Sequence, residues 1–152
     1  KTVDGRLSGM INEFILGAER PIVGHGIGTT GEAKTHSGMK RQAAHNLYAE
    51  LLIEIGIIGF VIFMLYIGAI YKIFKRNRML ILKISEARPY TEFEFYHKLN
   101  LALTTVFWMY VVYSINYYGL SVSYWYLFGG LAVAFGNILL HKVELVKELN
   151  VK

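Results

Sequence analysis

Cysteine is absent from the 152 residues, and proline occurs only twice. Without Cys the chain can form neither disulfides nor thiolate metal sites, and its cysteine content does not indicate whether the protein lies in a reducing or an oxidising compartment. Charge is missing over a long stretch as well, because residues 99–140 contain no Lys, Arg, Asp or Glu. A soluble domain can hardly accommodate so long an uncharged stretch, whereas a membrane protein places it in lipid.

Apolar residues make up 54% of the chain, more than a soluble core of this size normally requires. The formal net charge of +5 would suggest a nucleic-acid partner if the basic residues formed one face. Many of them lie instead between apolar runs, as topology signals do. We therefore expect an all-α integral membrane protein that does not bind nucleic acid.

Three membrane-spanning helices are expected from the apolar runs. The first covers residues 47–74, because no charged residue lies between Ile55 and Tyr71 and the run reaches the roughly 20 residues that a span needs. The uncharged stretch 99–140 provides two more, joined by a short aromatic-rich turn. Residues 75–98 are then a connector, and residues 141–152 form a tail.

The basic residues predict the orientation. Residues 72–98 contain seven Lys or Arg against three Glu, which is typical of the cytoplasmic side. His141, Lys142 and Lys147 place the tail on that side too. Residues 1–46 are then extracytoplasmic, in the periplasm or outside the cell.

The extracytoplasmic segment consists of an expected helix and an expected loop. Apolar residues recur at helical spacing between Lys1 and Arg20, which predicts an amphipathic helix that is too polar to span and ends at Pro21. Five glycines predict a loop over residues 22–41 that builds no core of its own. The chain begins with Lys, and we expect it to be a piece of a longer polytopic bundle.

His45 is the first candidate for chemistry, because it stands where the polar segment becomes the apolar helix. An imidazole has an ordinary pKa of about 6.5, so it can accept a proton from a hydroxyl at neutral pH. The alternative is a His at a helix start that hydrogen-bonds to its neighbours. Asn46 is interpreted more simply as a helix cap.

Arg6 is the second candidate, since a guanidinium can hold the oxygens of a phosphate or diphosphate in a bidentate manner. The alternative is a solvated surface Arg. Arg20, Lys40 and Arg41 add positive charge to the same segment, and each alone is expected to contact lipid head groups or solvent.

The glycine-rich stretch from Gly24 to Gly28 has the spacing of a phosphate loop without the matching context of strand and helix. It is expected to form a tight turn where the backbone approaches another segment, with His25 as a secondary polar contact. The spacings of eleven and nine between His25, His36 and His45 fit no metal-ligand signature, so no metal site is expected.

Glu54 lies four residues after Glu50, at the mouth of the first span, where an acid is costly unless it faces protein or water. On an unbroken helix it lies opposite His45 and cannot orient that imidazole. A structural role, pairing with an Arg elsewhere in the bundle, and a catalytic role both stay open.

Four motifs occur in a characteristic order: Gly5-Arg6, Pro21–Gly28 (P-x-x-G-x-G-x-G), His45–Tyr48 and Glu54–Gly59 (E-x-G-x-x-G). In order and spacing they closely resemble the O-antigen ligase and polymerase family, in which a large periplasmic loop carries these elements and closing transmembrane helices follow. The resemblance covers roughly Gly5 to Phe60. Met10 stands where the family often has an aromatic residue, which bears on helix packing more than on chemistry.

The resemblance implies an enzyme of the bacterial inner membrane that moves a glycan from an undecaprenyl-diphosphate carrier onto lipid A core, another glycan or a protein. His45 would be the base that activates the acceptor hydroxyl, and Arg6 would hold the diphosphate, with neither cofactor nor metal required. The expected substrate-binding residues are His25, Arg20, Lys40, Arg41, Asn46, Tyr48 and Glu54.

Two other functions remain open. The first is a non-catalytic membrane component that binds or passes lipid-linked glycan. The second is a transporter, which ranks last because the second and third expected spans carry no acid or base for a pathway. The choice between ligase and polymerase stays open as well.

Overall fold

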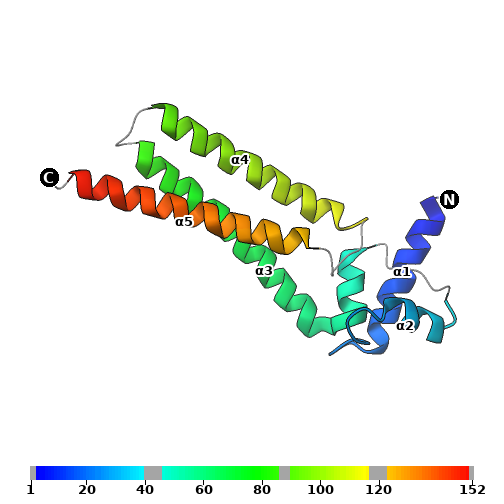
Figure 1. Ribbon diagram of the computed structural model, residues 1–152. Helices are drawn as coiled ribbons and strands as arrows, with labels where there is room; N and C mark the ends of the chain where they lie inside the picture. The colour runs from blue at the N-terminus through cyan, green and yellow to red at the C-terminus, as the bar shows by residue number, and fades with distance from the viewer. Residues whose placement is uncertain (1–2, 40–45, 86–89, 117–122, 151–152) are drawn as a thin grey trace. The chain divides into compact units, whose positions relative to one another are not determined.

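The computed structural model describes residues 3–39, 46–85, 90–116 and 123–150, with the side chains of residues 3–7, 84, 90–92, 146–147 and 149–150 outside that description. Over these ranges the chain is helical and contains no strand. The helices are α1 (Val3–Glu19), α2 (Thr30–His36), α3 (Leu47–Ser85), α4 (Tyr90–Tyr113) and α5 (Tyr124–Asn150), as Figure 1 shows. The prediction of an all-α chain is confirmed.

Two of the described helices are long and apolar enough to cross a membrane: α3 over Leu47–Lys83 and α5 over Tyr124–Leu145. They support an association with the membrane. The second expected span, residues 99–118, falls on α4, which is not one of these two helices and ends at Tyr113. The last two residues of that expected span, 117 and 118, lie outside the described residues.

The helices also extend into the expected connector. α3 continues past residue 74 to Ser85, and α4 begins at Tyr90 rather than at residue 99. The reason is that α3 keeps an apolar face beyond its uncharged run, where Leu80 and Ile81 are buried. Basic residues mark where a helix leaves the membrane, but they do not end a helix.

The chain folds as two compact units. The loop unit comprises residues 1–65 and 110–122, and the bundle unit comprises residues 66–109 and 123–152.

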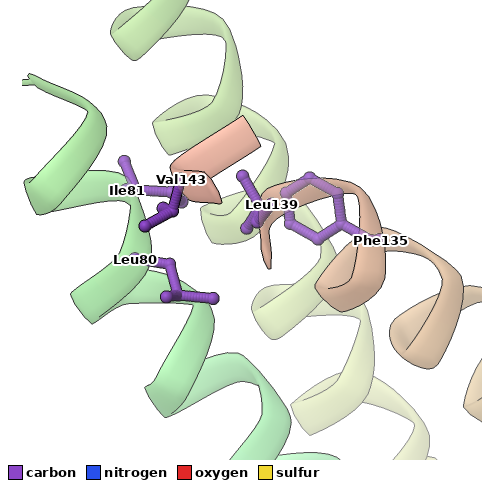
Figure 2. Packing of buried hydrophobic residues seen from close by; sticks show 5 residues of the cluster. All are labelled: Leu80, Ile81, Phe135, Leu139 and Val143. Carbon is purple, nitrogen blue, oxygen red and sulfur yellow. The ribbon is translucent and has the colours of Figure 1, made fainter. Parts of the chain in front are cut away.

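In the bundle unit, α5 packs against the later part of α3 through a buried aliphatic and aromatic cluster, shown in Figure 2. Its members are Leu80, Ile81, Phe135, Leu139 and Val143, and side chains of α4 pack against it. Two glycines of α5 allow side chains of α3 to come close to the α5 backbone. Gly129 faces the ring of Tyr66, whose hydroxyl donates to the carbonyl of Trp125 at 2.8 Å, and Gly136 faces Arg76 and Asn77.

In the loop unit, α1 and α2 pack on the first turns of α3. The core there consists of Leu16, Ala33 and Ile53, which are 0%, 4% and 0% exposed. The amphipathic helix expected before Pro21 is present as α1. The prediction that residues 22–41 form a loop is wrong for residues 30–36, because they form α2, which buries Ala33 in a core shared with α1 and α3. Contacts with α1 and α3 stabilise this short helix despite Gly31 inside it.

Candidate functional site

The candidate site is organised around a break in α3 at Gly56, whose backbone angles are φ 63° and ψ −166°. In an unbroken helix the Ile57 N–H would donate to the Ile53 carbonyl, and the Ile58 N–H to that of Glu54. The break separates both pairs. Buried backbone groups must find other partners, so two N–H groups and two carbonyls have to be satisfied from elsewhere.

The glycine-rich loop Pro21–Gly28 satisfies all four groups. The His25 N–H donates to the Ile53 carbonyl at 2.7 Å, and the Gly26 N–H to the Glu54 carbonyl at 2.9 Å. In return the Ile57 N–H donates to the Pro21 carbonyl at 2.8 Å, and the Ile58 N–H donates to the carbonyl of Ile22 at 3.4 Å. The loop therefore replaces the missing helical hydrogen bonds on both sides of the break. We call residues 21–28 with residues 53–58 the junction.

Two glycines make the junction possible. Gly24 has φ +70°, and a Cβ there would lie 2.5 Å from the carbonyl carbon of Glu54. Gly56 also has positive φ, and a Cβ there would overlap the carbonyl oxygen of Ile22. Both positions need a residue that tolerates left-handed backbone and has no side chain. The expectation of a tight turn at a close backbone approach is confirmed, and the segment approached is the broken helix.

The carboxylate of Glu54 closes the junction. Glu54 is 4% exposed, its Oε2 accepts the Gly28 N–H at 2.9 Å, and its Oε1 accepts the Thr30 hydroxyl at 2.7 Å. Hydrogen bonds to both oxygens stabilise a buried carboxylate. Among the described residues Glu54 forms no ion pair, and its hydrogen bonds to Gly28 and Thr30 give it a structural role; an Arg partner and a catalytic role stay predictions. No pattern in the sequence predicts the hydrogen bond from Thr30 to Glu54.

A buried ion pair holds α2 against α1. The Nζ of Lys34 lies 2.6 Å from Oε1 of Glu13, and the two side chains are 7% and 3% exposed. The Thr29 hydroxyl donates to the Gly26 carbonyl at 2.6 Å and fixes the turn between the loop and α2. This ion pair could not be predicted from the sequence. The two residues are 21 positions apart with a loop between them, so no helical spacing relates them.

Asn46 caps α3, as expected. Its side-chain oxygen accepts the N–H groups of Tyr48 at 2.8 Å and Ala49 at 3.2 Å. The first turn of α3 is also tied to the end of α4, where the Leu47 N–H donates to the Ser114 carbonyl at 3.0 Å and the Tyr48 hydroxyl to that of Val111 at 2.9 Å. Asn46 and Tyr48, predicted to bind substrate, thus already have partners in the protein.

The two predicted catalytic residues are not brought together by any described contact. His45, like Lys40 and Arg41, lies outside the described residues. Arg6 belongs to α1, with its side chain outside the description. Their proximity therefore stays a prediction.

Of the remaining predicted site residues, Arg20 precedes the junction and His25 lies in it. Arg20 is exposed, and its carbonyl accepts the Gly24 N–H at 3.0 Å. His25 is half-buried, and its Nε2 is buried without a hydrogen-bond partner among the described residues. That nitrogen is available to a polar group that the described residues do not supply. The described residues contain no cluster of three His, Asp or Glu that could hold a metal ion.

The arrangement is thus a glycine-rich loop hydrogen-bonded to a break near the start of α3. No protein-family model, no curated protein and no solved structure matches this chain.

Proposed function

We propose that this chain is the carboxy-terminal part of a membrane glycosyltransferase of the O-antigen ligase and polymerase type. It would move a glycan from an undecaprenyl-diphosphate carrier to a hydroxyl of lipid A core or of another glycan. The observation that supports this proposal is the junction, in which the P-x-x-G-x-G-x-G segment and the E-x-G-x-x-G segment exchange hydrogen bonds.

The junction gives a physical reason for finding these two motifs in one chain. Gly24 is required because Glu54 lies against it, and Gly56 is required because Ile22 lies against it. The Glu54 carboxylate in turn holds Gly28. Residues that depend on one another in this way form one structural unit, which supports interpreting the two motifs together, as the resemblance to the family does.

In the proposed reaction His45 acts as the general base. It accepts the proton of the acceptor hydroxyl while that oxygen bonds to the anomeric carbon of the donor sugar. The bond between this carbon and the diphosphate oxygen breaks, and the diphosphate leaves with the electron pair. The Arg6 guanidinium stabilises the charge that develops on the leaving diphosphate. Holding both reactants in line supplies the remaining part of the rate enhancement.

The proposal includes the charge-derived topology. Residues 1–46 lie in the periplasm or outside the cell, α4 crosses the inner membrane between α3 and α5, and the tail after residue 140 is cytoplasmic. The excess of basic residues between 72 and 98 supports this orientation.

The test is glycan transfer in cells that depend on this protein. His45→Ala and Arg6→Ala are introduced into the intact protein, and product is measured beside the amount of protein in the membrane. Loss of a general base lowers the rate by about 100-fold to 10,000-fold, so we expect almost no product from His45→Ala at normal protein level. His36→Ala, an exposed His on α2, is the matched control and should leave transfer unchanged.

Undiminished product from either variant would remove that residue from the mechanism. If both variants keep full transfer while the protein still binds lipid-linked glycan, the chain is the non-catalytic component instead.

A further inference from the structure

The junction loop exposes three bulky aliphatic side chains. Ile22, Val23 and Ile27 are 62%, 69% and 77% exposed. Single exposed apolar residues are ordinary, but a cluster of large ones on one short loop marks an interaction surface. The same loop keeps Gly24 buried against α3, so its backbone faces the protein while these side chains face outward.

This cluster continues into α3. Beyond the break, the exposed aliphatic residues recur at the spacing of one helical face: Ile57, Ile58, Val61, Ile62 and Leu65. The Pro21 and Ile22 carbonyls bond to the first two residues of this face, which places the loop at its start. We call these eight exposed side chains of the loop and of α3 the aliphatic surface.

The loop backbone is hydrogen-bonded to protein at several of its polar groups. Non-helical backbone is tolerated at membrane depth only where such groups are satisfied by protein, so a partly satisfied loop is suited to the edge of the bilayer, where water reaches its other groups. The N–H groups of Gly24, His25, Gly26 and Gly28 donate to protein oxygens, and the carbonyls of Pro21 and Ile22 accept from α3. A solvated surface loop would leave most of these groups to water.

We propose that the Pro21–Gly28 loop lies at the edge of the bilayer with the side chains of Ile22, Val23 and Ile27 in its hydrocarbon, and that lipid chains cover the aliphatic surface. The covering material is lipid rather than another helix, because helix–helix seams in membranes use small residues and this surface consists of Ile, Val and Leu. α3 itself is one of the two described helices able to span the membrane. The exposed Arg20 before the loop is suited to the phosphate level of the lipids.

Spin labelling tests the proposal, and the chain favours this method because it contains no cysteine. Val23→Cys and Ile27→Cys are each labelled in the intact protein, with any cysteine outside these residues replaced, and reconstituted into vesicles of phosphatidylethanolamine and phosphatidylglycerol. Ile62→Cys on the same surface serves as the lipid reference, and Thr35→Cys on an exposed position of α2 serves as the water reference. Collision rates with oxygen and with a water-soluble nickel chelate are then measured.

We expect the labels at Val23 and Ile27 to collide at least fivefold more with oxygen than with the chelate, as at Ile62, and the label at Thr35 to show the reverse. Collision mainly with the chelate would overturn the proposal, because the loop would then lie in water. Low collision with both reagents would overturn it as well, because protein would then cover the surface. The measurement needs no turnover, so its outcome is independent of the glycosyltransferase proposal.

Discussion

Replacing Gly56 with Ala tests whether the junction holds the broken helix and the loop together. A non-glycine residue at φ 63° and ψ −166° is strained by about 1–3 kcal/mol. The new Cβ would also overlap the Ile22 carbonyl oxygen, so the loop has to withdraw. Withdrawal breaks the hydrogen bonds of the loop to both sides of the break, each of which contributes about 0.5–1.5 kcal/mol net.

The expected effect is local. Strain and lost hydrogen bonds together lower the free energy of opening the junction by about 3 kcal/mol, which corresponds to a hundredfold or greater rise in the open population. Hydrogen exchange of the protein in lipid nanodiscs reports this opening through the amides of His25 and Gly26, which are protected by Ile53 and Glu54. We therefore expect their exchange in Gly56→Ala to be about a hundredfold faster.

Gly68→Ala is the matched control on the same helix. A Cβ at Gly68 meets nothing within 4 Å, and its φ is not positive. Exchange at His25 and Gly26 should stay unchanged in this variant. If Gly56→Ala also exchanges like the unaltered protein, the loop does not depend on the break, and the account of the junction is wrong.

Three further experiments probe the buried polar groups. Glu54→Gln removes one of the two carboxylate oxygens that accept from the Gly28 N–H and the Thr30 hydroxyl. We expect hydrogen exchange of the loop amides to become about tenfold faster. Unchanged exchange would contradict the role of Glu54 in holding the loop. Glu13→Gln leaves the Lys34 charge buried and should destabilise the α1–α2 contact by about 3 kcal/mol in thermal unfolding, whereas adding Lys34→Met should restore most of that stability. Asn77→Leu replaces a fully buried amide that has no partner among the described residues, and should raise the unfolding temperature in detergent; a lower temperature would show that the amide is bonded in the intact protein.

Helical periodicity and charge predicted the helices that carry a one-sided apolar face. α1 follows from the spacing of its apolar residues, and the Asn46 cap from its place before the apolar run. The ends of α3 and α4 could not be predicted in this way. Lys and Arg are good helix formers, so a basic segment reports where lipid ends and not where the helix ends.

The break in α3 has no local signal, because Gly56 and Gly59 lie in a run that reads as a continuous apolar helix. The groups that make a break tolerable lie in the loop more than 25 residues earlier, and only folding brings them to Ile53 and Ile57. α2 was missed for the same reason, since its burial of Ala33 and Lys34 depends on α1 and α3. Local propensity is a weak guide where tertiary contacts decide the conformation.

The segment Leu47–Ile55 shows what the break in α3 makes possible. Its start is fixed by the Asn46 cap and by the hydrogen bond to Ser114, and its end is fixed by the loop. In a continuous helix the carbonyls of Ile53 and Glu54 would accept hydrogen bonds from the N–H groups of Ile57 and Ile58. They could then not accept the N–H groups of the loop. A catalytic group has to be held to within about 0.5 Å, which rigid and doubly fixed elements achieve and free loops do not. The proposed base, His45, comes directly before the Asn46 cap of this segment, so the broken helix would serve the proposed function by tying the glycine-rich loop to the helix that follows the base.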